Sequence, residues 1–127
     1  MNPTDPVQTV RHFLVAMERR DLATARTMLA PGFLMTFPGG ARMTTLEELV
    51  AWAQPRYKRV EKRYERFDVS TADDGAAVVY CYGTLQGELH SGEAFSGIRF
   101  IDRFTVANGL LLDQKVWNDM AEVLWKR

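Results

Sequence analysis

Apolar residues in the first part of the chain recur with the spacing of a helix. Asp5 and Pro6 form a favourable N-cap and first helical residue, and the apolar positions that follow predict a helix over residues 6–19. Asp21 can cap a second helix, which is predicted to end at Ala30 before a Pro-Gly pair. The apolar stripe of the first helix consists of Val7, Val10, Phe13, Leu14 and Met17.

A strand and a third helix are predicted next. The segment GFLMTFPGG, residues 32–40, is typical of a strand that ends in a Pro-Gly-Gly turn. Thr45 and Glu48 have the spacing of a capping box and predict the start of the third helix. Pro55 should end or kink this helix, although its apolar pattern can resume through residues 57–60.

The second half of the chain alternates between apolar and polar residues, which is the pattern of strands. The turn signals DDG, HSGE and NG separate four predicted strands over residues 64–72, 76–89, 94–106 and 110–118. Helices followed by an antiparallel meander predict an α+β fold, with three N-terminal helices packed against a curved sheet that leaves a cup. No repeat or linker-like run divides the sequence, so we expect a single domain over residues 1–127.

Composition limits the possible classes of protein. The chain is 46% hydrophobic and 25% charged, as in ordinary globular proteins, and no run approaches the roughly 20 apolar residues that span a bilayer. The N-terminus lacks the pattern of a secretory signal, so we expect a cytoplasmic protein with no membrane partner. One cysteine, Cys81, and two histidines give neither an internal disulfide nor metal-ligand spacing. We therefore expect no metal and no cofactor.

Charge is balanced over the whole chain but not locally. Sixteen basic and sixteen acidic residues give no overall field that would favour nucleic acid. The segment RYKRVEKRYER, residues 56–66, nevertheless holds six basic and two acidic residues. This segment can be a solvated helix face, or it can be a surface that binds phosphates. We expect the first, and therefore no nucleic-acid partner.

A carboxylate interrupts an apolar row in the segment FSGIRFIDRFTV, residues 95–106. Phe100, Asp102, Phe104 and Val106 fall on one face of the predicted strand, because strand side chains alternate. An isolated carboxylate is costly to bury, so Asp102 is the first candidate for a functional residue.

The order of these elements, together with the segment GIRFIDRFTVANGLLLDQKVWND, resembles the SnoaL-like branch of the nuclear transport factor 2-like superfamily. That family ends in an arginine-flanked Asp-Arg-Phe strand, a Gly turn, an apolar strand and a Trp near an Asp. The resemblance implies a cone-shaped fold with a pocket, and a homodimer formed through the sheet. It implies no single activity, because the family includes isomerases, cyclases, epoxide hydrolases, dehydratases and binding proteins.

Two enzyme types within this resemblance can be compared residue by residue. Steroid isomerases use an Asp base on the first strand, a Tyr on helix one and a protonated Asp on a late strand. Matching MTFP to the base segment places Phe37 at the base, and matching the first helix places Phe13 at the Tyr, so only Asp102 is kept. A phenyl ring accepts no proton. Epoxide hydrolases place an Arg and an Asp two residues apart, whereas Arg99 and Asp102 are three apart. Neither residue set is complete.

Hairpin geometry predicts the neighbours of Asp102. If residues 108–109 form a two-residue turn, Asp102 lies opposite Lys115 and Phe100 lies opposite Trp117. On the other side, a three-residue loop at 91–93 would place Tyr82 beside Asp102 and Tyr80 beside Phe104, and a loop longer or shorter by one residue moves the tyrosines to the other face. In one interpretation Asp102 is satisfied by Lys115 or Tyr82 and has no chemical role. In the other it lies in an apolar cup where burial raises its pKa.

Two functions remain open. The first is a cofactor-independent proton-transfer enzyme acting on a hydrophobic cyclic molecule, with Asp102 as acid or base and with Tyr82 or His90 assisting. The second is a non-catalytic ligand-binding or dimeric assembly module. The predicted pocket lining consists of Phe13, Met17, Phe37, Trp52, Tyr80, Phe100, Lys115 and Trp117. The predicted outer face of the sheet, expected to form the homodimer, carries Val79, Cys81, Ile101 and Val116.

Overall fold

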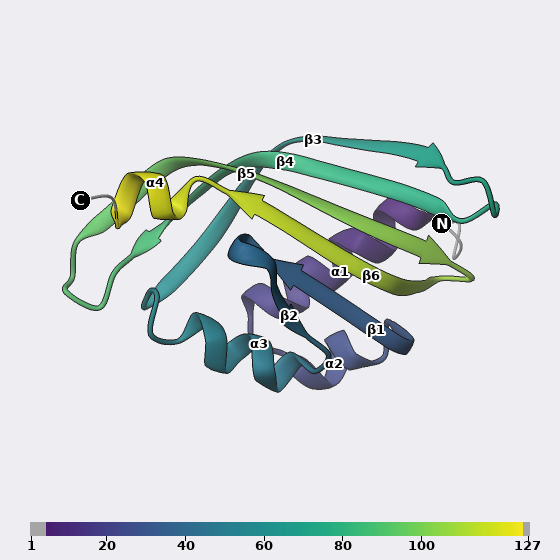
Figure 1. Ribbon diagram of the computed structural model, residues 1–127, viewed down its shortest axis with the longest axis horizontal. Helices are drawn as coiled ribbons and strands as arrows, with labels where there is room; N and C mark the ends of the chain where they lie inside the picture. The colour runs from purple at the N-terminus through teal and green to yellow at the C-terminus, as the bar shows by residue number, and fades with distance from the viewer. Residues whose placement is uncertain (1–4, 126–127) are drawn as a thin grey trace.

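The computed structural model describes residues 5–125, and it confirms the α+β fold (Figure 1). A six-stranded sheet has the order β2-β1-β6-β5-β4-β3, in which β1 and β6 are parallel and the other neighbours antiparallel. No helix in the described part of the chain is long and apolar enough to cross a membrane. The elements are α1 (Pro6–Glu18), α2 (Leu22–Arg26), β1 (Leu29–Phe37), a 3₁₀ turn (Pro38–Gly40), β2 (Ala41–Met43), α3 (Leu46–Ala53), β3 (Arg59–Thr71), β4 (Ala77–Glu88), β5 (Ala94–Ala107), β6 (Leu110–Asn118) and α4 (Met120–Leu124).

The first three helices begin at the predicted caps. Asp5 accepts a hydrogen bond from the backbone N–H of Val7, Asp21 caps α2, and Thr45 and Glu48 form the capping box of α3. The end of α2 was predicted too late, because the chain leaves the helix at Arg26 to join the sheet alongside β6. The short strand β2 and the C-terminal helix α4 were not predicted.

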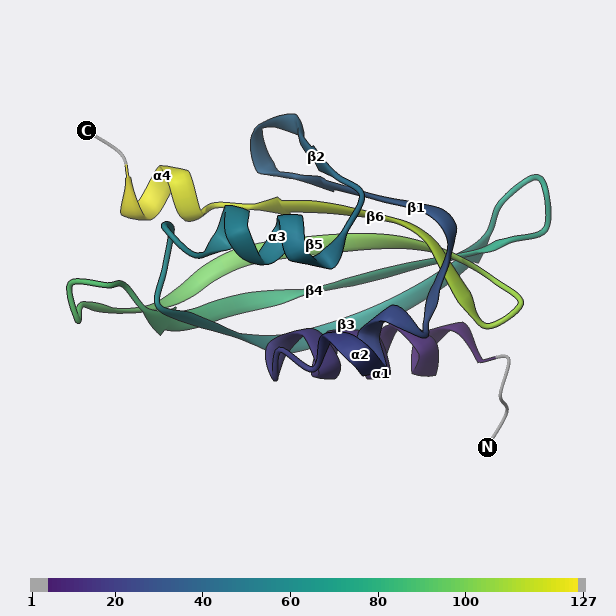
Figure 2. The ribbon, with the colours of Figure 1, turned by 90° about the horizontal axis from the view of Figure 1, so that it is seen from below.

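The three N-terminal helices cover the concave face of the sheet, and α4 lies at one end of it (Figure 2). The fully buried side chains of Phe13, Val79, Cys81, Phe104 and Leu111 join the helices to the sheet in one core. The assignment of Val79 and Cys81 to the outer face was therefore wrong. Val116 also faces inward, whereas Ile101 lies on the outer side beside the exposed Trp117.

The basic segment 56–66 is largely strand, so its interpretation as a helix face was wrong. Strand β3 begins at Arg59, and residues 59–65 alternate between exposed and half-buried side chains. Val60, Lys62 and Tyr64 therefore share the inner face. Pro55 ends the helical region. The alternation typical of a strand is hard to recognise in the sequence, because most residues of this segment are charged and only these three side chains face inward.

The register between β5 and β6 differs from the prediction by one residue. The turn at residues 108–109 forms as expected, but Leu112 is an extra residue that forms a bulge between the Val106–Leu111 and Thr105–Asp113 pairs. Asp102 consequently lies opposite Val116, and Lys115 points to the outer face. Phe100 likewise lies opposite Asn118 and not Trp117.

A second bulge changes the register between β4 and β5. Ser96 and Gly97 together oppose Gln86, and Gly97 adopts a positive φ of 71° that suits a bulge. Asp102 therefore pairs with Cys81, and Tyr82 pairs with Ile101 on the outer face. The predicted contact between Tyr82 and Asp102 was wrong for this reason.

Candidate functional site

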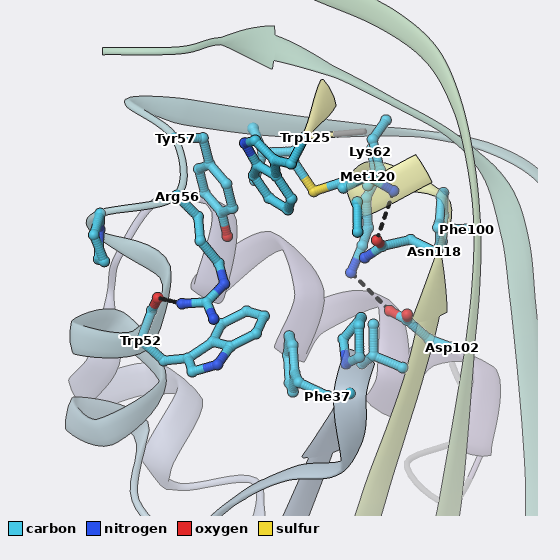
Figure 3. Close-up of a pocket in the computed structure, with 17 residues that line it drawn as sticks. Phe37, Trp52, Arg56, Tyr57, Lys62, Phe100, Asp102, Asn118, Met120 and Trp125 are labelled. Atoms are coloured by element: carbon cyan, nitrogen blue, oxygen red, sulfur yellow. Dashed lines mark hydrogen bonds and ion pairs between the residues drawn. The ribbon is translucent and has the colours of Figure 1, made fainter. Parts of the chain in front are cut away.

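A cavity of about 520 Å³ lies where α3 ends, β3 begins and β6 runs into α4 (Figure 3). Its volume is that of a site for a small organic molecule, and most of its lining is apolar or aromatic. The lining residues are Phe37, Pro38, Gly39, Trp52, Pro55, Arg56, Tyr57, Val60, Lys62, Leu85, Phe100, Asp102, Val116, Asn118, Met120, Ala121 and Trp125.

A buried ion pair forms part of the cavity wall. Nζ of Lys62 donates to Oδ2 of Asp102 at 2.7 Å, and the Asp102 side chain has no accessible surface. The Lys62 side chain keeps 21% exposure, so Lys62 is the member of the pair that reaches the cavity surface. Oδ1 of Asp102 makes no hydrogen bond of ordinary geometry among the described residues, but the side chain of Gln114 lies close enough to favour the charged form of this carboxyl. The site thus holds an ammonium group backed by a fully buried carboxylate, which the buried side chain of Gln114 also approaches.

Burial and charge act against each other on this pair. Burial raises the pKa of the Asp102 carboxyl above its ordinary value, and the attraction of Lys62 only partly opposes this. Burial alone would lower the pKa of Lys62, but the charge of Asp102 raises it above its ordinary value. Lys62 is therefore held in its protonated form, and Asp102 ionises less readily than an exposed carboxyl. Such opposed effects are common at functional sites.

Aromatic groups form the side of the cavity that faces Asp102. The rings of Phe37 and Trp52 meet edge to face at 5.2 Å, and the Arg56 guanidinium lies over the Trp52 ring at 3.7 Å. The Tyr57 side chain lies beside them and points inward (Figure 3). Burial raises the pKa of the Tyr57 hydroxyl, although nearby cations lower it, so this hydroxyl stays protonated and can donate. These groups form an apolar wall of two rings set at 64° to each other, with polar groups beside it.

A smaller cavity of about 80 Å³ lies beside the C-terminal half of α1. Phe13 and Met17 line it, and both are nearly fully buried. Phe13 also contacts the rings of Phe33 and Phe104 edge to face, which is core packing. The two cavities share the side chains of Phe37, Tyr57, Val60 and Lys62, which separate them.

The structure brings only part of the predicted site together. Phe37, Trp52, Phe100 and Asp102 line the larger cavity. Five of the predicted site residues line neither of these two cavities of the described chain: Tyr80, Tyr82, His90, Lys115 and Trp117. The two bulges moved four of them to the outer face, and His90 lies in the loop before β5, where its Nε2 contacts the carbonyl oxygen of Gln54.

Sequence reasoning missed several lining residues. Lys62 could have been found, because Val60, Lys62 and Tyr64 alternate within the basic segment. Arg56 and Tyr57 belong to the connection after α3, whose course depends on where the helix ends. Met120 and Trp125 belong to the short helix α4 and its end, for which the sequence gives only a weak signal.

Comparisons with known proteins agree with the geometry. The model of the SnoaL-like domain family matches residues 10–114, and no curated protein matches. A protein of unknown function from Burkholderia pseudomallei, described as NTF2-like, superposes with a TM-score of 0.77 at 21% identity, covering 98% of this chain and 97% of that one.

Two further solved structures are informative. TerC, crystallised with polyporic acid, superposes with a TM-score of 0.78 at 14% identity, covering 95% of each chain. A candidate SnoaL-like polyketide cyclase from Jannaschia sp. superposes with a TM-score of 0.68 at 21% identity, covering 93% of this chain and 88% of that one. At such identities the likeness establishes the cone-shaped fold.

Proposed function

Because the chain belongs to the SnoaL-like domain family of the nuclear transport factor 2-like superfamily, we propose that its larger cavity binds a hydrophobic cyclic molecule and catalyses a proton transfer on it. The observation that carries this proposal is the Lys62–Asp102 pair in the wall of an apolar cavity. The relatives add support, since TerC was crystallised with polyporic acid and a neighbour is described as a candidate polyketide cyclase.

Each member of the pair has a role in the proposed step. Lys62 donates a hydrogen bond to a carbonyl oxygen of the substrate and stabilises the negative charge that develops there. As the Lys62 ammonium turns from Asp102 to that oxygen it uncovers the buried carboxylate, and a proton leaves the adjacent carbon for the ionised Asp102 while the C–H bonding pair delocalises onto the carbonyl oxygen to give the enolate. The same carboxyl then returns the proton to a different carbon atom of a conjugated enolate, which gives an isomer, or to the alkoxide oxygen that forms when the enolate carbon attacks a second carbonyl group of the substrate, which closes a ring. This reaction is an isomerisation or forms part of a cyclisation, and it consumes no cofactor.

Deuterium exchange into 2-tetralone, a cyclic hydrophobic ketone, tests the proposed chemistry. In D₂O the protein should accelerate exchange at the activated carbon, as followed by NMR, and Asp102→Asn should abolish the acceleration while retaining binding. Arg63→Gln is the matched control, because Arg63 is the exposed neighbour of Lys62. Wild-type exchange no faster than in buffer would contradict proton transfer.

A non-catalytic binding module is the second candidate. It is favoured by the complete burial of Asp102 and by its contact with Lys62, which together can satisfy the carboxylate without any reaction. Tight binding of 2-tetralone with no exchange would support this function over the first.

We also propose a homodimer formed through the outer face of the sheet. Trp117 is 51% exposed there and pairs across the strands with Ile101, which leaves a large aromatic surface uncovered in a single chain. Light scattering at micromolar concentration should give the mass of two chains, and a monomer mass would contradict this proposal.

A further inference from the structure

Apart from Asp102, the polar side chains of Arg56, Tyr57, Lys62 and Asn118 that line the larger cavity can all donate hydrogen bonds. Arg56 and Lys62 can only donate, and the protonated Tyr57 hydroxyl can donate as well. Asn118 accepts a hydrogen bond at its Oδ1 from the backbone N–H of Met120 at 3.1 Å. Since that partner is a donor, the amide oxygen is the bound atom and the amide nitrogen of Asn118 remains for a ligand.

Acceptors for these donors are scarce in the cavity. Asp102 is the one acidic residue among the described lining residues, and it has no accessible surface. Its Oδ2 already accepts from Lys62. Any carboxylate that could balance a second cation must therefore come from outside the described lining.

Arg56 is such a second cation. One of its terminal nitrogens donates to the carbonyl oxygen of Trp52, and its guanidinium lies over the Trp52 ring. No ion pair between Arg56 and an acidic side chain is found within residues 5–125. Figure 3 shows the Arg56 side chain extended along the cavity between Trp52 and Tyr57. The guanidinium is thus held in place with donor capacity to spare.

We propose that the ligand is a planar aromatic anion, in which one or more ionised oxygens of a carboxylate, phenolate or enolate contact Lys62 and Arg56. The aromatic part packs against Phe37 and Trp52. This inference rests on the proposed function, because it names the class of molecule that the same cavity binds. The physical reason is that a cation in an apolar cavity is stabilised most by an anion, which no accessible lining residue supplies.

A matched pair of probes tests the inference directly. Anthracene-2-carboxylate and anthracene-2-carboxamide have the same ring system and almost the same shape, but only the first is charged at pH 7. Fluorescence anisotropy should show that the carboxylate binds at least tenfold more tightly to the wild-type protein. Equal affinity for the two probes would overturn the anion preference and leave ligand binding by the cavity intact. Binding of neither probe would contradict both the inference and the proposed function.

Single variants identify the residues that cause the preference for the anionic probe. Arg56→Gln and Lys62→Gln should each reduce the ratio of the two affinities at least threefold, whereas Arg63→Gln, which removes an exposed charge beside Lys62, should leave it unchanged. Arg56→Gln leaves no buried carboxylate unpaired, so it keeps the test decisive if Lys62→Gln fails to fold. If the ratio of the two affinities in Arg56→Gln equals the wild-type ratio, Arg56 does not contact the anion, and the assignment of two cations to the ligand is overturned.

Discussion

Lys62 and Asp102 form an ion pair of 2.7 Å although their strands, β3 and β5, are separated by β4. Lys62 pairs with Leu85 on β4, whereas Asp102 pairs with Cys81, four positions away along the same strand. The residue midway between these two on the inner face is Gly83. The long side chain of Lys62 can therefore reach diagonally across β4, because no side chain stands between it and the carboxylate.

The ion pair predicts a strong energetic coupling. Lys62→Met should lower the free energy of unfolding by about 3–5 kcal/mol at pH 7, because it leaves Asp102 buried without its cationic partner. Adding Asp102→Leu to the same chain should restore most of this loss, since two apolar side chains bury no charge. Urea denaturation of the two single variants and the double variant measures the coupling. Additive losses would mean that the contact contributes nothing in solution.

Gly83 should be sensitive to the smallest added side chain. A Cβ atom at this position would lie 2.0 Å from the backbone oxygen of Arg63, in the strand that carries Lys62. We expect Gly83→Ala to destabilise the protein by about 1–3 kcal/mol, because β3 must move away from β4. Thermal unfolding provides the measurement, with Thr84→Ala at the next position as control. Equal stability of the two variants would contradict the close approach of the strands.

Much of the fold could be predicted because its signals are local. Each of these signals depends on residues that are close in the sequence. They are the helix caps at Asp5, Asp21 and Thr45, the turn at residues 108–109 and the alternation of apolar and polar residues in the second half of the chain. These signals, together with the resemblance of the C-terminal segment, were sufficient for the α+β cone. They were also sufficient to place Asp102 on the inner face.

The partner of Asp102 could not be predicted for a physical reason. The bulges at Leu112 and near Gly97 each shift the register by one residue, and a one-residue shift exchanges the two faces of a strand. Lys115 was therefore predicted on the inner face and lies on the outer one. The residue that pairs with Asp102 is Lys62. This contact crosses β4 and depends on the curvature of the whole sheet, which cannot be predicted from a local sequence pattern.

The raised pKa of Asp102 determines how stability depends on pH. A carboxyl whose pKa is higher in the folded protein than its ordinary value of 3.8 binds protons more strongly in the folded state. Stability should therefore fall as the pH rises from about 4 through the raised pKa, relative to Asp102→Asn, which lacks this titration. Urea denaturation of both proteins at several pH values measures the difference. A difference that grew in favour of the wild type with rising pH would show a lowered pKa instead.

Asp102 also controls the charge of Lys62. In the wild type the carboxylate raises the pKa of Lys62 against the effect of burial. In Asp102→Asn burial acts almost alone, so the pKa of Lys62 should fall below its ordinary value of 10.5. An NMR titration of the lysine side chains would detect this shift, with Lys58 and Lys115, both exposed, as internal references. An unchanged pKa of Lys62 in Asp102→Asn would mean that the ammonium and the carboxylate do not interact.

Intrinsic fluorescence can show which cavity wall a ligand touches. Of the three tryptophans, Trp52 and Trp125 line the larger cavity, whereas Trp117 is half-exposed on the outer face. A bound aromatic ligand such as anthracene-2-carboxylate should quench Trp52 and Trp125 by contact and energy transfer more strongly than Trp117. Trp117→Phe should therefore retain most of the quenching, and Trp52→Phe should lose a large part of it. Quenching that disappeared with Trp117→Phe would place the ligand on the outer face of the sheet, where the dimer is proposed to form.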